Sequence, residues 1–272
     1  MLLITTSVVN NPKFIELQNM TLKKFIKNPY KFVVYNDAKD WSDYSNFYDP
    51  LLKKEISSLC SKLNIECIEI DNNKHQYTTI DASTRCADAC NYMLKDHLKY
   101  NGRTLVIDSD MFLINYLDVD EKYKGFEMAA VPQIRQNCIP YIWNGLVYYN
   151  MPIVKNKQLL KWDLIGKAEH GITDVGGSFY YYLINTPNAQ IYSINHLYSC
   201  SWNRTQFSSK LNTKLLNFLE NDPKNVDNKF FAEIYDDTYL HYRAGGNWIK
   251  EGKELHDKRT DLLWNTIVDI VQ

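Results

Sequence analysis

Short apolar runs alternate with longer amphipathic stretches over the first 107 residues of the chain. Four runs rich in β-branched and aromatic residues have the length of strands: residues 2–9, 31–37, 65–70 and 104–107. Between them, apolar residues recur every three or four positions at about 11–25, 50–63 and 83–98, which is the spacing of helices. This ordered alternation predicts the α/β class, with a mostly parallel central sheet flanked by helices on both faces.

Beyond residue 110 the pattern becomes less regular. We expect strands at 126–134, 141–151 and 189–194, a strand-like segment at 238–248, helices at 155–168, 210–220 and 257–271, and a further helix opening at Ser178. No repeat, low-complexity linker or shift in composition marks a boundary. The sequence therefore predicts a single domain spanning residues 1–272.

Composition narrows the class of partner. A formal net charge of −1 lacks the basic excess typical of proteins held on nucleic acid by phosphate contacts, so there is no strong electrostatic signal for nucleic acid. Aromatic residues are frequent, with 20 Tyr, 11 Phe and 6 Trp. They suit stacking on sugars or bases, and a biased genomic base composition explains them equally well.

Cysteine usage and the N-terminus indicate the compartment. The six cysteines, at 60, 67, 86, 90, 138 and 200, form no Cys-x-x-Cys pair and indicate reduced, mostly buried thiols. The opening "MLLITTSVVNN" has no basic segment and is typical of a first strand rather than a signal peptide. No run approaches the roughly 18 apolar residues of a membrane span. We therefore expect a soluble, cytoplasmic protein with no transmembrane segment.

The stretch "GRTLVIDSDMFLIN" places two acids at the end of a buried strand. Asp108 and Asp110 follow residues 104–107 with only Ser109 between them, and apolar residues resume at Met111. Two carboxylates so close repel each other and lose hydration on burial, so a positive partner is expected between them. Ligands of open parallel sheets bind beyond the carboxyl ends of the strands, and hard divalent cations prefer carboxylate oxygens. The alternative is a loop with two solvated acids.

The wider sequence resembles a known class. The run "DSDMF", the segment before it ("TTIDASTRCADACNYMLKDHLKYNGRTLVI"), the later "YIWNGLVYYNM" and the C-terminal "HYRAGGNW" resemble, in that order, the D-x-D-containing glycosyltransferases of the GT-A fold, over roughly residues 1–250. The resemblance implies a Rossmann-like GT-A domain. Residues about 1–115 would form its nucleotide-sugar-binding half, and about 116–272 its acceptor-binding half. It also implies metal-dependent transfer of a sugar from a nucleoside-diphosphate donor, UDP by default, to an acceptor hydroxyl.

Carried over residue by residue, the resemblance assigns a metal site and a donor site. Asp110 and His241 would bind Mn²⁺ or Mg²⁺, and Asp108 would contact the metal, the ribose or the donor sugar. A lone histidine after a strand is more often structural, but here a glycine pair follows that can bring backbone close to phosphates. The other residues assigned to the donor are Thr5, Thr6, Ser7 and Asp37 for the nucleoside, Arg85 for the diphosphate or sugar, Trp143, Asn144 and Gly145 for the sugar, Gly245, Gly246 and Lys250 near the diphosphate, and Ser109 for the donor in general.

The sequence departs from the glycogenin-like retaining branch of these enzymes at two places. That branch ends its histidine segment with Lys-Pro-Trp, where this chain reads "GGNWIK", so Arg243 or Lys250 would replace its diphosphate-binding lysine. The branch also carries Asp-Gln-Asp where this chain reads "TDVGGSFYYYL". Inverting and retaining transfer therefore both stay open.

Asp174 is the candidate catalytic residue. An inverting transferase needs a general base for the acceptor hydroxyl, and Asp174 precedes Gly176 and Gly177, where an acceptor can approach the backbone. In a retaining reaction, Asp174 would instead position the acceptor or stabilise the positive sugar centre. The alternative is a helix-capping or turn residue before Ser178.

Three other functions share parts of this pattern. A haloacid-dehalogenase-type Mg²⁺-dependent phosphohydrolase also places Asp-x-Asp after a strand, and Asp236–Asp237 mimics its later acid pair, but the motif here comes late in the chain. A nucleotidyltransferase would carry a Gly-rich basic loop where this chain reads "TTSVVNNPKF". A non-catalytic nucleotide-sugar binder would keep the metal site. The pattern is compatible with a glycan, lipid, protein or modified nucleobase as acceptor.

Overall fold

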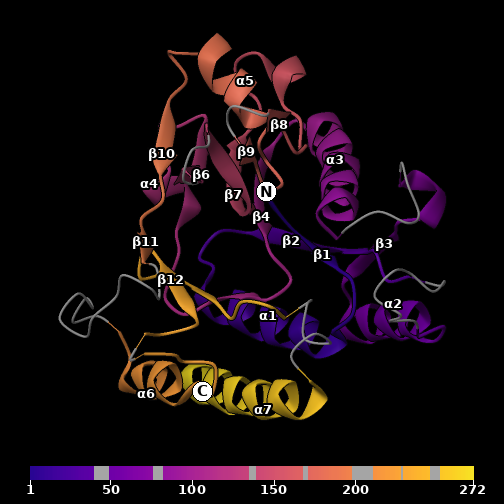
Figure 1. The fold of residues 1–272 in the computed structure, drawn as a ribbon, viewed down its shortest axis with the longest axis vertical. Helices are drawn as coiled ribbons and strands as arrows, with labels where there is room; N and C mark the ends of the chain where they lie inside the picture. The colour runs from indigo at the N-terminus through magenta and orange to yellow at the C-terminus, as the bar shows by residue number, and fades with distance from the viewer. Residues whose placement is uncertain are drawn as a thin grey trace. The chain divides into compact units, whose positions relative to one another are not determined.

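The computed structural model describes residues 1–39, 49–75, 82–134, 139–167, 171–197, 211–227, 229–245 and 252–272. The chain forms two compact units, each taken from distant parts of the sequence (Figure 1). The first unit comprises Met1–Asn10, Asn28–Asp108 and Tyr123–Ile194, and the second comprises Asn11–Lys27, Ser109–Lys122 and Asn195–Gln272. No helix within the described ranges combines the length and apolar character that crossing a bilayer requires.

The first unit is built on a sheet of seven strands, counted over the part of the chain that the structure describes. The strand order is β10-β6-β7-β4-β1-β2-β3. Strand β7 runs antiparallel to both of its neighbours, and the other pairs are parallel. The strands are β1 (Leu2–Val8), β2 (Tyr30–Asn36), β3 (Glu66–Glu69), β4 (Arg103–Ile107), β6 (Met128–Ile134), β7 (Pro140–Asn150) and β10 (Ile191–Ser193). This topology confirms the predicted α/β class with a mostly parallel central sheet.

Helices cover both faces of this sheet. They are α2 (Leu52–Leu63), α3 (Ala82–Tyr100) and α5 (Phe179–Asn185). Two neighbouring residues of β2 show the division, because successive side chains of a strand point to opposite faces. The hydroxyl of Tyr35 donates a hydrogen bond to Asp96 on α3 (3.2 Å), whereas the side chain of Asn36 donates to the carbonyl of Lys53 on α2 (2.7 Å). The predicted flanking helices are therefore present on both sides.

The core of the first unit fills the space between the sheet and α3. Apolar side chains of α3 and α5 pack with strand residues in one buried cluster, which includes Ala87, Met93, Leu94, Phe179 and Tyr182 together with Leu3, Val33, Val106, Val147 and Tyr149. Full burial of one large apolar side chain contributes about 1.5–3 kcal/mol. A cluster of this size holds the strand ends firmly, including the end of β4 that Asp108 follows.

The second unit carries a small antiparallel sheet in the order β11-β12-β13-β5. Its strands are β5 (Met111–Leu113), β11 (His196–Leu197), β12 (Glu233–Tyr235) and β13 (Tyr239–His241), and its helices are α1 (Pro12–Phe25), α4 (Val119–Lys122), α6 (Thr213–Asn221) and α7 (Lys253–Val271). Helix α7 packs against α1 and α6, and Phe14, Leu240 and Leu263 belong to the buried cluster of this unit. These helices hold β13 and β5, on which the candidate site depends.

The helix predicted at residues 155–168 is wrong. A short 3-10 turn forms at Lys157–Leu159, and an irregular segment then leads to β8 (Gly166–Lys167), which pairs with β9 (Gly171–Ile172). The side chain of Asn91 donates to the carbonyl of Trp162 (2.5 Å) and accepts from its N–H (2.9 Å). Asn91 thus supplies the backbone partners that a helix would have used, while Trp162 is buried in the core of the first unit.

Smaller differences concern short elements. The last helix begins at Lys253 rather than at about Asp257, and the strand expected within 238–248 is confined to Tyr239–His241 in the described part of that range. Strands β5, β8, β9, β11 and β12 were not predicted. Two or three residues are too few to show a periodic pattern in the sequence.

Candidate metal centre

Asp110 and His241 meet because of the small sheet in the second unit. Strand β13 ends at His241 and pairs with β5, which begins directly after Asp110. The N–H of Tyr242 extends this pairing by donating a hydrogen bond to the carbonyl oxygen of Asp110 (2.9 Å). Two buried side chains from distant parts of the sequence are therefore held side by side.

The carboxylate of Asp110 has two close polar neighbours. Its Oδ1 lies 3.3 Å from Nε2 of His241, and its Oδ2 accepts a 2.8 Å hydrogen bond from the N–H of Gly245. A Cβ atom at position 245 would lie 2.7 Å from the Cβ of Asp110 and 2.5 Å from the ring of Phe14. Only glycine permits this approach, so the structure places Gly245 against a carboxylate of the candidate site.

Glu233 lies behind His241, and the sequence analysis did not identify it. Nδ1 of His241 donates to Oε2 of Glu233 (2.8 Å), and the hydroxyl of Tyr235 donates to the same oxygen (2.9 Å). A carboxylate that accepts from one ring nitrogen orients the ring and leaves the other nitrogen facing Asp110. Metal-ligating histidines in proteins are supported in this way.

A hairpin signal in the sequence leads to Glu233. Strands β12 and β13 are joined by residues 236–238, and two of these, Asp236 and Asp237, have positive φ values (51° and 52°). Aspartate adopts this left-handed conformation more readily than most residues, and two such residues in a row are typical of tight hairpin turns. Pairing the strands outward from that turn sets Glu233 opposite His241.

Burial and neighbouring charges shift the pKa values of His241 and Asp110 in opposite directions. Burial by itself would lower the pKa of His241, but the carboxylates of Asp110 and Glu233 outweigh it and raise that pKa to about 10. Burial would likewise raise the pKa of Asp110, but His241 and the N–H of Gly245 reverse the effect and lower it. Both carboxylates therefore favour positive charge at the imidazole, and a cation bound at Nε2 would take the place of the proton there.

Asp108 completes a set of three potential ligands. One carboxylate oxygen each from Asp108 and Asp110 and one ring nitrogen of His241 lie within 4.8 Å of one another. Asp108 follows β4, and its N–H donates to the carbonyl of Gly145 (2.7 Å). Carboxylates and imidazole suit Mn²⁺, and Mg²⁺ commonly uses one or two carboxylates together with substrate phosphates. The donor atoms present therefore fit the predicted divalent cation.

An irregularity in β7 lies next to Asp108 in the first unit. The ladder between β6 and β7 shifts register and leaves residues 143–146 outside it. These residues include the predicted Trp143, Asn144 and Gly145. The carbonyl of Gly145 accepts the N–H of Asp108, and the side chain of Asn144 donates to the sulfur of Cys86 (3.4 Å). The structure therefore brings this predicted segment to the end of β4, and its contact with a donor sugar stays a prediction.

Asp174 belongs to the first unit, as Asp108 does. A hydrogen bond with Cys90 and burial raise the pKa of the Cys86 thiol, and the carboxylates of Asp108 and Asp174 both add to this rise. Oδ1 of Asp174 accepts the N–H of Val175 (2.8 Å). Asp174 is therefore a turn residue rather than the N-cap of α5, which is Ser178.

Gly176 and Gly177 pack tightly within the first unit. Gly176 has a φ of 104°, and a Cβ there would lie 2.1 Å from the carbonyl oxygen of Ile142. A Cβ at Gly177 would lie 1.9 Å from Oγ1 of Thr173. Neighbouring atoms of the protein leave no room for a Cβ at either position, which explains why both residues are glycines. Their acceptor-binding role stays a prediction.

Asp37 and Arg85 contact each other at the end of β2. Nη2 of Arg85 donates to Oδ1 of Asp37 (2.8 Å), and Nε2 of His75 lies 2.7 Å from the same oxygen. His75 also places Nδ1 3.7 Å from Asp88. The sequence analysis assigned Asp37 to the nucleoside and Arg85 to the diphosphate or sugar, and the structure joins them in one buried network.

The remaining predicted donor residues that the structure describes are Thr5, Thr6, Ser7 and Ser109. Thr5 and Thr6 are buried within β1, and Oγ1 of Thr5 lies 3.2 Å from Nε2 of His97. Ser7 and Ser109 are partly buried. Gly246 and Lys250 lie outside the residues that the structure describes. The nucleoside contacts of the first three and the donor contact of Ser109 stay predictions.

No family model matches the chain, and no curated protein matches it in sequence. Solved structures similar to it are glycosyltransferases by name. The apo WbbM bifunctional glycosyltransferase is 16% identical at a TM-score of 0.35, over 55% of this chain and 31% of that one. The apo mouse xyloside xylosyltransferase 1 is 12% identical at a TM-score of 0.38, over 75% of this chain and 86% of that one. The galactosyltransferase LgtC in complex with donor and acceptor sugar analogues is 9% identical at 0.35, over 55% of this chain and 58% of that one. The chain thus spans less than two thirds of the WbbM and LgtC chains, and TM-scores this low do not establish a common fold.

Proposed function

We propose that the chain is a metal-dependent glycosyltransferase, which moves a sugar from a nucleoside-diphosphate donor, most simply a UDP-sugar, to an acceptor hydroxyl. The observation that carries this proposal is the buried contact between Asp110 and His241, backed by Glu233 and joined by Asp108. Three carboxylates lie around one imidazole, and Arg243, whose Nε is 3.6 Å from Oε1 of Glu233, offsets only part of their charge where hydration is limited. Such an arrangement is costly unless a further cation joins it.

The ligand residues define what the site can hold. Asp108, Asp110 and His241 would hold Mn²⁺ or Mg²⁺, with Glu233 orienting the histidine ring. When bound, the cation supplies Lewis-acid stabilisation of the negative charge on the donor diphosphate. Because the protein provides few ligands, coordination positions remain for phosphate oxygens.

Arg243 is suited to replace the diphosphate-binding lysine that the sequence lacks. Its Nη1 donates to the carbonyl of Phe231 (3.2 Å), its Nε lies 3.6 Å from Oε1 of Glu233, and its side chain is 36% exposed. It follows His241 by two positions on the same segment. A partly exposed guanidinium next to the ligand-bearing residue suits an anionic diphosphate, which it can bind through two parallel hydrogen bonds.

Asp174 takes the role of general base if transfer inverts the sugar configuration. Its half-buried carboxylate and that of Asp108 both lie within electrostatic reach of Cys86, and its Oδ1 accepts the N–H of Val175. A base of this kind contributes typically about 10²–10⁴-fold to the rate. In a retaining reaction the same carboxylate would position the acceptor.

Incubation with a set of UDP-sugars and Mn²⁺ tests the proposal. We expect UDP release that stops when the metal is chelated. Release of inorganic phosphate from phosphoesters, with no UDP from UDP-sugars, would instead indicate a phosphohydrolase. Mn²⁺-dependent binding of nucleotide sugars without any release, in the presence of simple acceptors, would indicate a binding protein.

Calorimetry provides a second check on the same site. Nucleotide affinity should depend on Mn²⁺ and should favour UDP over UMP, because the cation bridges phosphate oxygens to protein carboxylates. Equal affinities for UDP and UMP that do not respond to Mn²⁺ would contradict the proposed centre. A thermal-shift screen of other nucleotide sugars identifies the base and the sugar, since a ligand that binds only the native state raises stability.

A further inference from the structure

We propose that Arg259 and Asp222, which no role in the site explains, are positioning residues for the metal centre. Their ion pair would hold the segment from His241 to Gly245 in the conformation that the centre needs. The inference rests on the proposed function, because it assigns these residues to the same site. It is carried by contacts within the second unit.

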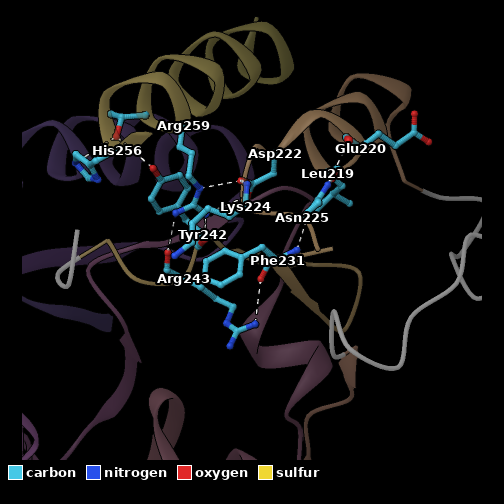
Figure 2. Close-up of polar contacts among 11 residues, drawn as sticks. Leu219, Glu220, Asp222, Lys224, Asn225, Phe231, Tyr242, Arg243, His256 and Arg259 are labelled. Carbon is cyan, nitrogen blue, oxygen red and sulfur yellow. Dashed lines mark hydrogen bonds and ion pairs between the residues drawn. The ribbon is translucent and has the colours of Figure 1, made fainter. Parts of the chain in front are cut away.

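Arg259 is fully buried, and its guanidinium donates hydrogen bonds to three different residues. Nε and Nη2 donate to the two carboxylate oxygens of Asp222 (2.8 and 3.0 Å), as Figure 2 shows. Nη2 also donates to the carbonyl of Tyr242 (2.8 Å), and Nη1 donates to the carbonyl of Arg243 (3.3 Å). The guanidinium therefore joins helix α7 and the end of α6 to the two residues that follow His241.

Aromatic rings fix the plane of this guanidinium. Its central carbon lies 4.1 Å from the ring centroid of Tyr242 and 4.8 Å from that of Phe231. Figure 2 shows Arg259 reaching from α7 toward Asp222 and Tyr242. A planar, delocalised cation suits this position, since it makes forked hydrogen bonds in its plane and ring contacts on its faces.

The segment that Arg259 contacts has a strained backbone. Arg243 and Ala244 both have positive φ values (61° and 58°), a region that residues with a Cβ rarely occupy. Two such residues in sequence persist only when surrounding contacts enforce them. The two hydrogen bonds from Arg259 to the carbonyls of residues 242 and 243 are contacts of this kind.

The same segment touches Asp110 at both ends. The N–H of Tyr242 donates to the carbonyl of Asp110, and the N–H of Gly245 donates to its carboxylate (2.9 and 2.8 Å). The strained pair lies between these two contacts. Arg259 therefore contacts the same segment, residues 242–245, that contacts Asp110. By holding this segment, Arg259 would keep the carboxylate of Asp110 aligned with the imidazole of His241.

The test compares Mn²⁺ affinity among folded variants, measured by the electron paramagnetic resonance of free Mn²⁺. Removing one partner of a buried ion pair is strongly destabilising, whereas replacing both by apolar residues is often tolerated. The main variant is therefore the double change Asp222→Leu with Arg259→Met. Arg259→Lys is the second variant, since it keeps the charge but loses the fork that reaches both carbonyls.

A matched control is available on the same helix. Glu254 and Lys258 form an exposed ion pair on α7 (2.8 Å). The double change Glu254→Leu with Lys258→Met removes an acid–base pair from the exposed surface of the helix and leaves Arg259 and Asp222 unchanged. Urea unfolding followed by near-ultraviolet circular dichroism gives the stability of each variant, so that affinity is compared only between folded proteins.

We expect both Arg259 variants to bind Mn²⁺ about 10- to 100-fold more weakly than the wild type, as happens when groups behind metal ligands are removed. The control should stay within about twofold of the wild type. If the variants are less stable but bind Mn²⁺ as tightly as the wild type, the ion pair has a purely structural role and the inference is wrong. Failure of the wild type itself to bind Mn²⁺ would instead refute the proposed centre, and this inference with it.

A measurement on the wild type covers the case in which both Arg259 variants fail to fold. Binding couples reciprocally, so Mn²⁺ should slow hydrogen exchange in peptides that contain Arg259 as well as in those that contain His241. Slower exchange confined to the peptides of Asp110 and His241 would overturn the inference. Slower exchange that includes the peptide of Arg259 but not that of Glu254 would support it.

Discussion

Nδ1 of His241 donates a 2.8 Å hydrogen bond to Oε2 of Glu233 across the paired strands β13 and β12. The other ring nitrogen, Nε2, consequently points to Oδ1 of Asp110 at 3.3 Å. Contacts with a carboxylate at each ring nitrogen hold the imidazole of His241 in one orientation, because rotation of the ring would break both of them. Glu233 thus determines which nitrogen is available to a cation.

Replacing Glu233 by glutamine should weaken Mn²⁺ binding by about 10- to 100-fold. The amide keeps the shape of the side chain but removes the charge that orients and polarises His241. Affinity is measured by titration with Mn²⁺ in the absence of substrate. Tyr235→Phe is the matched control, because it removes only the hydroxyl that donates to the same oxygen of Glu233. Wild-type affinity in the glutamine variant would contradict the role of Glu233.

Asp110→Asn and Asp110→Ala should both abolish sugar transfer but should differ in stability. Asparagine can still accept the hydrogen bond from Gly245, whereas alanine leaves that buried N–H without a partner. Such a loss costs about 1–3 kcal/mol in the free energy of unfolding. Urea denaturation measures the difference, and UDP release measures activity. Measurable transfer by either variant would remove Asp110 from the site.

Asp174→Asn should lower transfer by about 10²–10⁴-fold while leaving donor affinity near that of the wild type. Asparagine keeps the hydrogen bond to Val175 but cannot accept the acceptor proton. Asp163→Asn is the control, since Asp163 makes the same kind of contact with the N–H of the next residue, Leu164 (3.1 Å). Equal transfer rates for the two variants would show that Asp174 is only a turn residue.

Gly176→Ala should destabilise the protein more than Gly125→Ala. Both glycines have positive φ values (104° and 82°), so both substitutions carry a backbone cost of about 1–2 kcal/mol. At Gly176 the new Cβ would also lie 2.1 Å from the carbonyl of Ile142, whereas nothing lies within 4 Å at Gly125. The steric conflict should add about 1–3 kcal/mol. Equal urea midpoints with equal slopes would contradict the described turn.

His97 should make the protein less stable in acid. Burial, opposed by the nearby Asp96, lowers the pKa of His97 to about 4 in the folded chain, compared with 6.5 as its ordinary value. Between these values the unfolded chain binds a proton that the folded chain does not, so stability falls as the pH decreases from 6.5 toward 4. The loss approaches about 2–3 kcal/mol.

His97→Gln isolates this effect, since glutamine can keep a hydrogen bond to Thr5 and does not titrate. Urea unfolding of both proteins at neutral pH and near pH 4.5 measures how much stability each protein loses between the two pH values. A variant that loses as much stability as the wild type over this range would show that other groups cause the acid sensitivity.

Local patterns were sufficient for most of the first unit. The strands and helices up to Ile107 follow from apolar periodicity, and the structure agrees with them within a few residues. The predicted helix at 155–168 failed because Asn91, on another element, supplies the hydrogen bonds of Trp162. A contact between distant residues overrode a local preference, and no window of the sequence contains both partners.

The sequence by itself determined that the chain would form an α/β sheet, and its resemblance to a known family singled out Asp108, Asp110 and His241 for a cation. The first conclusion depends on apolar periodicity and the second on short motifs. Only the tertiary structure decided that Glu233 backs His241 and that Arg259 pairs with Asp222 beside the same segment. These contacts arise when a hairpin closes and when a helix packs against its neighbours, and neither step leaves a periodic signal. The orientation of the site is therefore a property of the folded chain rather than of its motifs.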